Sequence, residues 1–137
     1  MGTAENKALV RRYFKAYETG DVEAVVAFLH PRHVFHPEGG RRALGLRARK
    51  REDAIFLRGF PRVRVAVEDQ VAEGDRVATR VTMIATQSGR YQGRPPTGKR
   101  IRIPFMDIAR VRGGKIVEEW TEFDWAGLLR RLGGKKE

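Results

Sequence analysis

The sequence predicts an α+β fold in which helices lie on one face of a curved antiparallel sheet. Before residue 61, apolar residues recur at three- and four-residue steps, which is the period of a helix. From Val63 onwards they alternate with charged residues, which is the period of a strand. Helices followed by consecutive long strands are typical of the α+β class. The length of 137 residues fits a single domain over residues 1–137.

The first two helices are predicted from their caps and their apolar stripes. Thr3 is a candidate N-cap of the first helix, which ends at Gly20. Its inner stripe is largely aromatic and consists of Leu9, Val10, Tyr13, Phe14 and Tyr17. Asp21 is a candidate cap of the second helix, which runs through Leu29 and ends at "HP", because proline disfavours helical geometry in the residue before it.

A short strand, a loop and a third helix are expected next. The segment "HVFHP" at residues 33–37 is predicted to be the strand, and residues 39–48 the loop. A helix of about ten residues is predicted around residues 53–60, and Pro61 stops it.

Two hairpins follow. "AEGDR" turns the chain within the first and Gly113-Gly114 within the second, while "SGRYQGRPPTGK" is a loop between them. The alternation places the four strands at residues 63–67, 77–83, 101–111 and 116–123. A short helix that begins near Trp125 closes the chain.

The composition excludes several classes of protein. Because the sequence has no cysteine, it can form no disulfide framework, zinc ribbon or thiolate nucleophile. The N-terminus mixes charge with its first apolar residues, unlike a signal peptide, and no apolar run is long enough to span a bilayer. We therefore expect a soluble, cytoplasmic protein without a membrane partner.

The formal net charge of +11 and the pI near 10.8 raise nucleic-acid binding as an alternative. The arginines come in pairs spread from end to end, whereas a binding stripe would concentrate them. The densest basic segment, residues 41–51, has no aromatic residue for base stacking. A solvated cationic surface is therefore favoured over nucleic-acid binding.

Motifs for phosphate, metal and serine chemistry are not found. The glycines fit neither the P-loop nor the dinucleotide fingerprint. His30, His33 and His36 follow one another without a second histidine group, so no metal site is predicted, and surface or hydrogen-bonded roles are favoured for the first two. Ser88 is the only serine and lies outside a nucleophile elbow.

Two carboxylates of the second hairpin have unusual positions. Asp107 shares its strand face with Ile101, Ile103, Phe105 and Ala109. Glu119 likewise falls in the more apolar row of the next strand, whose members are Val117, Glu119, Thr121 and Phe123. A two-residue turn would place Ile108 opposite Glu119, whereas a three-residue turn with Gly114 in a left-handed conformation would place Asp107 there. We favour the second, because it merges both apolar rows.

Nearby carboxylates in an apolar pocket cannot both ionise cheaply, so one of the pair Asp107 and Glu119 should have a raised pKa and exchange protons near neutrality. The alternative is that each pairs with an arginine. The aromatic helix stripe and the apolar strand rows also need a shared interior, so we expect a cavity there. Its predicted wall consists of Tyr13, Tyr17, Phe60, Met83, Phe105 and Phe123.

Three motifs carry a resemblance to a known family: "VAEGDRV" at 71–77, "G-x-PPTGK" at 93–99 and "D-I-x-R…GKIVE-x-W" at 107–120. Over nearly its whole length the chain resembles the SnoaL-like polyketide cyclases. The resemblance implies the cone-shaped fold of the nuclear transport factor 2-like superfamily, in which a bent sheet and N-terminal helices enclose a ligand cavity. Characterised members close a ring by aldol condensation of a polyketide ester without a metal or organic cofactor, so the resemblance implies no cofactor.

The resemblance also implies departures at the site. The acid/base aspartate of the cyclases falls at Thr121, two of their pocket histidines fall at Asp107 and Glu119, and a third falls at Gln87. The histidine that follows the first short strand is matched by His36. The resemblance therefore implies a retained cavity with a differently composed acid/base site.

Three functions compete at this stage. An enzyme would move a proton next to a carbonyl, with Asp107 or Glu119 as base and the other carboxyl group, Gln87 or Tyr17 at the developing oxyanion. A binding protein would hold a small apolar or anionic ligand without turnover, and a nucleic-acid binder would use the charge alone. A homodimer through the outer sheet face is expected from the resemblance and from the exposed apolar residues predicted there, Met106, Ile108 and Trp120.

Overall fold

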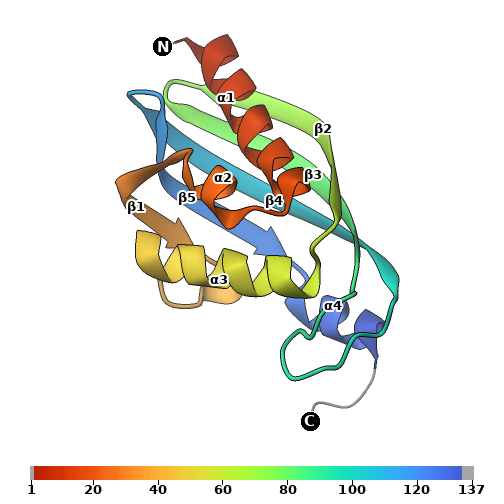
Figure 1. Ribbon diagram of the computed structural model, residues 1–137. Coiled ribbons are helices and arrows are strands. Elements are labelled where there is room, and N and C mark those ends of the chain that lie inside the picture. The colour runs from red at the N-terminus through yellow and green to blue at the C-terminus, as the bar shows by residue number, and fades with distance from the viewer. Residues whose placement is uncertain (1, 134–137) are drawn as a thin grey trace.

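A computed structural model describes residues 2–133, and it contains one curved sheet with the strand order β1-β5-β4-β3-β2. The strands are β1 (Leu29–His36), β2 (Val63–Glu73), β3 (Arg76–Thr86), β4 (Arg100–Arg112) and β5 (Lys115–Phe123). Helices α1, α2 and α3 lie across one face of the sheet, and α4 follows β5 at one end of the sheet (Figure 1). The predicted α+β class with N-terminal helices and a curved sheet is confirmed. One strand pair differs from the antiparallel expectation, because β1 runs parallel to β5.

The helices are α1 (Thr3–Lys15), α2 (Val22–Val26), α3 (Leu46–Gly59) and α4 (Trp125–Leu132), with 3-10 turns η1 (Ala16–Thr19) and η2 (Glu38–Gly40). Gly2 rather than Thr3 occupies the N-cap of α1, and Glu5 accepts a hydrogen bond from the Gly2 backbone N–H. Asp21 caps α2 as predicted, its side chain accepting from the Glu23 backbone N–H.

Three further helix boundaries differ from the prediction. Helix α1 ends at Lys15 and not at Gly20, and the 3-10 turn η1 follows it up to Thr19. Helix α2 ends at Val26 and not at Leu29, because Leu29 is buried in β1 opposite Ile116 of β5. Helix α3 begins at Leu46, within the segment predicted to be a loop. This earlier start places Arg49 on a helix and buries it against the sheet.

The β4–β5 hairpin combines a two-residue turn with a bulge. Gly113 and Gly114 have φ angles of 56° and 75°, the left-handed region that a tight hairpin turn requires. The register then shifts beside Val117, so that Ala109 lies opposite Glu119 and Asp107 lies opposite Thr121. The expectation that Asp107 and Glu119 would be directly opposed is therefore wrong, although both side chains do face the same side of the sheet.

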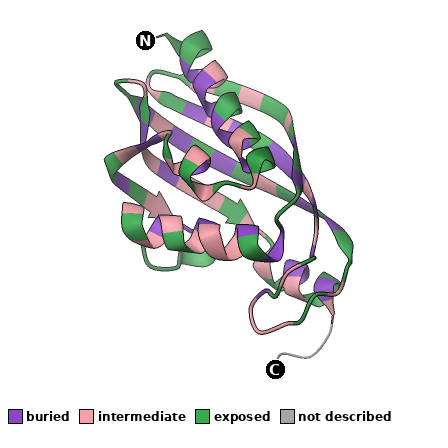
Figure 2. Cartoon of the chain, in the orientation of Figure 1, coloured by how far each residue is buried: buried purple, intermediate pink, exposed green. Residues whose placement is uncertain are grey.

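The core lies between the helices and the inner face of the sheet, where buried positions alternate with exposed ones along the strands (Figure 2). The predicted aromatic stripe of α1 is buried there: Tyr13 is fully covered and packs against Phe14 with ring centroids 4.8 Å apart. Within residues 2–133, no helix is both long and apolar enough to cross a membrane.

Candidate functional site

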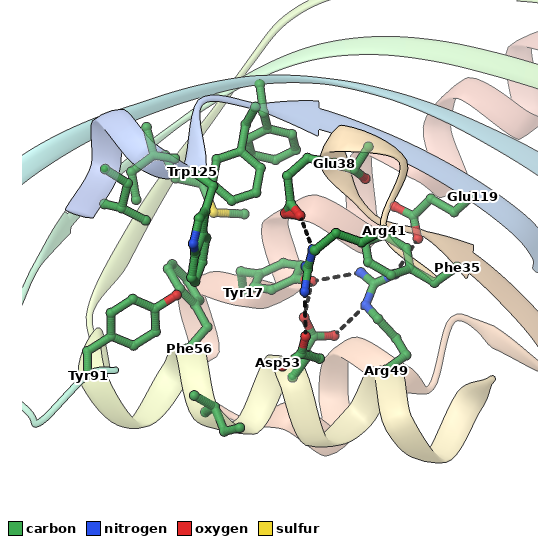
Figure 3. A pocket seen from close by; sticks show the side chains of 18 of the residues that line it. Tyr17, Phe35, Glu38, Arg41, Arg49, Asp53, Phe56, Tyr91, Glu119 and Trp125 are labelled. Carbon is green, nitrogen blue, oxygen red and sulfur yellow. Dashed lines mark hydrogen bonds and ion pairs between the residues drawn. The ribbon is translucent and has the colours of Figure 1, made fainter. Parts of the chain in front are cut away.

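A pocket of about 390 Å³ lies between α3, α4 and the inner face of the sheet. One end is aromatic and takes side chains from α3, the loop after β3, β5 and α4: Phe56, Tyr91, Phe123 and Trp125. The other end is polar and contains Tyr17, Arg49, Asp53, Glu119 and Thr121. Figure 3 shows these two ends, with Glu38 and Arg41 between them. The pocket therefore fits a molecule with an apolar ring system and a polar end.

Arg49 is the centre of the polar end. Its Nη1 donates to Glu119 Oε1 at 2.8 Å, and its Nε donates to Asp53 Oδ2 at 3.1 Å (Figure 3). Its Nη2 donates to the hydroxyl groups of Tyr17, at 3.1 Å, and Tyr13. The guanidinium group also lies 3.9 Å above the centre of the Phe35 ring. One buried cation thus connects α3 to η1, α1 and β5.

Asp53 and Tyr17 form a second contact at the same end. The Tyr17 hydroxyl donates to Asp53 Oδ1 at 2.9 Å, and both residues line the pocket. Burial raises the pKa of Asp53, and the Arg49 charge and the Tyr17 hydrogen bond only partly offset this. Burial, followed by the Asp53 charge, also raises the pKa of Tyr17. Asp53 is therefore a carboxyl group with increased basicity next to a neutral phenol.

Glu119 and Asp107 are both buried but differ in charge state. Burial alone would raise the pKa of Glu119. The Arg49 charge, the neighbouring Asp107 and His33 together outweigh burial, so the pKa lies below its ordinary value. Burial, followed by the Glu119 charge, raises the pKa of Asp107 well above its usual range. Glu119 is thus the ionised partner of Arg49, and Asp107 is a neutral acid behind it, as expected for adjacent carboxyl groups.

Asp107 is connected to the pocket through Thr121. The Thr121 hydroxyl donates to Asp107 Oδ1 at 2.7 Å, and Thr121 itself lines the pocket. Among residues 2–133, Asp107 Oδ2 has no hydrogen-bond partner. The Thr121 side chain therefore separates Asp107 from a molecule bound in the pocket.

His33 completes the buried network beneath Glu119. Its Nδ1 lies 2.9 Å from the Ile116 carbonyl oxygen, so Nδ1 carries the proton. Its Nε2 lies 3.7 Å from Glu119 Oε1, and burial lowers the pKa of His33 despite that neighbouring charge. The prediction of a hydrogen-bonded role for His33 fits this position.

A chain of charged groups lies along the edge of the pocket, between its two ends. Glu38 on η2 is buried and accepts from Arg41 Nε at 2.7 Å, and Arg41 Nη1 lies 3.6 Å from Glu52 on α3. The Arg41 side chain is 53% exposed, compared with 10% for Glu38. The η2 loop is therefore joined to α3 by an arginine at the edge of the pocket.

The sequence profile of the SnoaL-like polyketide cyclases matches residues 7–132. The chain belongs to this family. Among solved structures, AclR from Streptomyces galilaeus, described as a candidate hydroxylase, is 30% identical with a TM-score of 0.88, covering 99% of this chain and 85% of that one. Comparison with curated proteins gave no match.

Two further structures agree with this family fold. IdmH from Streptomyces antibioticus, described as a candidate polyketide cyclase, is 28% identical with a TM-score of 0.80, covering 94% of this chain and 99% of that one. A SnoaL-like protein from Jannaschia sp. CCS1 has a TM-score of 0.84 at 21% identity, covering 97% and 94% of the two chains, and shows similarity of fold alone.

The structure of this SnoaL-like protein separates the predicted site residues into two groups. The pocket is lined by Tyr17, Met83, Phe105, Glu119, Thr121 and Phe123. Tyr13 and Phe60 are not part of the lining but lie behind it: Tyr13 donates to Glu119 at 3.0 Å, and Phe60 stacks on Phe56 with centroids 5.0 Å apart.

Asp107, His36 and Gln87 are also outside the lining. His36 is on the outer face, stacked on Trp120 at 5.0 Å and bonded to Glu118 at 2.8 Å. Gln87 is fully buried, and its amide serves the loop after β3: it donates to three loop carbonyl groups and accepts from the Thr97 backbone and hydroxyl. With its amide engaged in this way, Gln87 shapes the loop and is not available to an oxyanion.

Sequence reasoning missed many residues that line the pocket, among them three charged residues: Glu38, Arg49 and Asp53. All three lie in or near the basic segment that was interpreted as a loop and a solvated surface. One signal was present, because Arg49 and Asp53 are four residues apart, the spacing at which charged side chains meet on a helix. This pair could be recognised only with a helix that begins at Leu46, because the predicted helix around residues 53–60 does not contain Arg49.

Proposed function

We propose that this SnoaL-like protein binds a small aromatic carbonyl compound and moves a proton at the carbon next to the carbonyl group, as a cyclase, isomerase or lyase would. The observation that carries the proposal is the contact between Asp53 and Tyr17 on the pocket wall, 2.9 Å apart. A base with raised pKa beside a hydrogen-bond donor is the arrangement that enolate formation requires.

Asp53 is the proposed base. Its carboxylate takes the proton from the carbon, and the electron pair of that C–H bond moves into the enolate. The Tyr17 hydroxyl, which donates to Asp53 without a ligand, turns to the developing enolate oxygen and leaves an Asp53 lone pair free. The enolate carbon then attacks a second carbonyl group, whose oxygen receives the proton from Asp53, as in ring closure, or the carbon itself regains that proton.

Glu119 and Asp107 are proposed to position this pair. Both oxygens of Glu119 are engaged by Tyr13, and Oε1 also accepts from Arg49, so its ionised carboxylate is a weak base that holds the guanidinium in place. Asp107 lies behind Thr121 and supplies a neutral partner to Glu119. This assignment moves the base from the β4–β5 pair, where the sequence suggested it, to α3.

Proton exchange in D₂O tests the proposal without a known substrate. The protein is incubated with a panel of aryl ketones and β-ketoesters, and loss of the α-proton is followed by NMR. We expect exchange above the buffer rate, reduced about a hundredfold or more by Asp53→Asn, the usual contribution of a general base. Asp69→Asn, an exposed change of the same kind on β2, is the control. Equal exchange rates in the two variants would contradict the role of Asp53.

A non-catalytic binding function is the second candidate. Thr121 stands where the family resemblance implies the acid/base aspartate, and its hydroxyl is already bonded to Asp107. A panel member that binds in the pocket without α-proton exchange would favour this function over the enzyme.

We also propose that the chain forms a homodimer through the outer face of the sheet. Val71, Met106 and Ile108 are 67%, 60% and 43% exposed there, and Val71 and Ile108 flank Ala78 in one row across three strands. Trp120 extends the row but is half-buried under His36. A second copy of the same face would cover this apolar surface.

A further inference from the structure

The pocket has the opposite charge to the protein. The whole chain has a formal charge of +11, yet the ionisable groups that line the pocket include four carboxylates, namely Glu38, Glu52, Asp53 and Glu119, and only two guanidinium groups, Arg41 and Arg49. Counted with all six ionised, the lining has a formal charge of −2. An anionic ligand would enter against this charge, and a cationic ligand would enter with it.

The two arginines are not equivalent. Arg49 is buried, and four of its five N–H groups donate to Asp53, Glu119 and both tyrosines, so it is held in place within the wall of the pocket. Arg41 is more than half exposed, follows the η2 turn and forms ion pairs with two carboxylates, Glu38 at 2.7 Å and Glu52 at 3.6 Å. The Arg41 guanidinium group therefore occupies a site for a cation, and its side chain could move away from that site.

The surroundings of that position suit a cation. Glu38 is buried beside the ring end of the pocket, where Trp125, Phe56 and Tyr91 are gathered (Figure 3). Aromatic faces and a desolvated carboxylate are the two groups that recognise an organic ammonium ion. Without a ligand, the Arg41 guanidinium group provides the charge that Glu38 needs when buried.

We propose that the pocket selects an aromatic compound with a protonated amino group, which displaces Arg41 from Glu38 and Glu52. The inference rests on the proposed function, because it assumes that this pocket is the ligand site. The polar end with Asp53 and Tyr17 then faces the carbonyl part of the ligand, and the ammonium group lies at the pocket edge.

Calorimetry with three matched probes tests the inference on the unmodified protein. The probes are 2-naphthylmethylammonium, neutral 2-naphthylmethanol and anionic 2-naphthoate at physiological salt. We expect the ammonium probe to bind about tenfold or more tightly than the carboxylate, despite the net positive charge of the chain. Equal or tighter binding of 2-naphthoate overturns the inference and leaves the proposed function standing. If none of the three binds, both fail.

Two variants, each with a matched control of the same charge change, distinguish the pocket from the general charge of the protein. Arg41→Gln removes the competing cation and should strengthen binding of the ammonium probe about three- to tenfold, whereas Glu38→Gln should weaken it by a similar factor. Arg42→Gln and Glu73→Gln make the same charge changes at exposed positions outside the pocket and should leave it unchanged. Weaker ammonium binding by Arg41→Gln, with the thermal unfolding midpoint unchanged, would contradict displacement.

Discussion

Arg49 Nη1 on α3 lies 2.8 Å from Glu119 Oε1 on β5, and both side chains are at least 95% buried. This ion pair joins the helix layer to the sheet at the polar end of the pocket. Without Glu119, the buried Arg49 would keep Asp53 as a carboxylate partner but would lose its ion pair with the sheet. The pair therefore links the stability of the fold to the geometry of the site.

Glu119→Gln should destabilise the protein much more than Asp107→Asn. The first change removes one of the two carboxylate partners of the buried Arg49, and we expect a cost of about 3 kcal/mol, the lower end of the range for a broken buried pair, because Asp53 remains. The second replaces a neutral acid by a neutral amide of the same shape, and we expect a cost of about 1 kcal/mol or less near pH 5. Chemical denaturation of both variants measures the difference. Similar costs in the two variants would contradict the assignment of Glu119 as the ionised carboxylate of the pair.

The free energy of unfolding should depend on pH through Asp107. Burial and the Glu119 charge raise its pKa in the folded state, so between the unfolded and folded values the folded protein binds more protons. Stability therefore falls as the pH rises above about 4, the unfolded value for aspartate. Asp107→Asn lacks this loss, so its stability relative to the wild type should increase from about pH 5 to about pH 8. A pH-independent difference would contradict the raised pKa.

Gln87→Ala should loosen the loop that carries Tyr91 into the pocket. The Gln87 amide holds the carbonyl groups of Gly89, Arg94 and Pro95, and each lost buried bond costs about 1 kcal/mol. Amide hydrogen exchange over residues 88–98 should accelerate at least about tenfold. Ser88→Ala, an exposed change in the same loop, is the control. Unchanged exchange would show that the loop is held by other contacts.

Much of this fold could be predicted because the spacing of apolar residues within a helix or strand is a local property of the sequence. Alternation along β4 predicted that Asp107 faces inward with Ile103 and Phe105, and the structure buries all but the half-buried Phe105 on that face. The exact register could not be predicted, because the bulge at Val117 depends on packing that the turn sequence does not encode. The parallel pairing of β1 with β5 likewise depends on contacts between residues far apart in sequence.

The site was harder to predict than the fold. Glu119 and Thr121 follow from strand alternation, but Arg49 lies in a basic segment whose composition is typical of exposed surface. Only burial against Glu119 and Asp53 distinguishes Arg49 from the exposed Arg47 and Arg51 on the same helix. Tertiary contacts, not local sequence, therefore determine which of these arginines belongs to the site.

Sedimentation velocity tests the proposed homodimer. We expect a dimer at micromolar protein, and Ile108→Lys should shift it to monomer because it places a charge in the apolar row of the outer face. Ala126→Lys adds the same charge on the exposed side of α4 and should leave the dimer intact. A monomeric wild type would remove the proposal.

We do not expect nucleic acid to be a specific ligand of this protein. Any binding of a random single-stranded oligonucleotide, followed by fluorescence anisotropy, should collapse between low and moderate salt, because it rests on phosphate contacts alone. Affinity that persists at moderate salt would restore the nucleic-acid alternative.

Amide NMR of the labelled protein, titrated with the aromatic carbonyl and amine probes, tests most directly whether the pocket is the ligand site. We expect the shift changes to cluster at Asp53, Phe56, Tyr91, Thr121 and Trp125, which line it from α3, α4, β5 and the loop after β3. They should persist at moderate salt, because an enclosed site depends little on screening. Shift changes confined to the basic surface around Arg32, Arg110 and Arg112, or lost as salt rises, would contradict the assignment of function to this pocket.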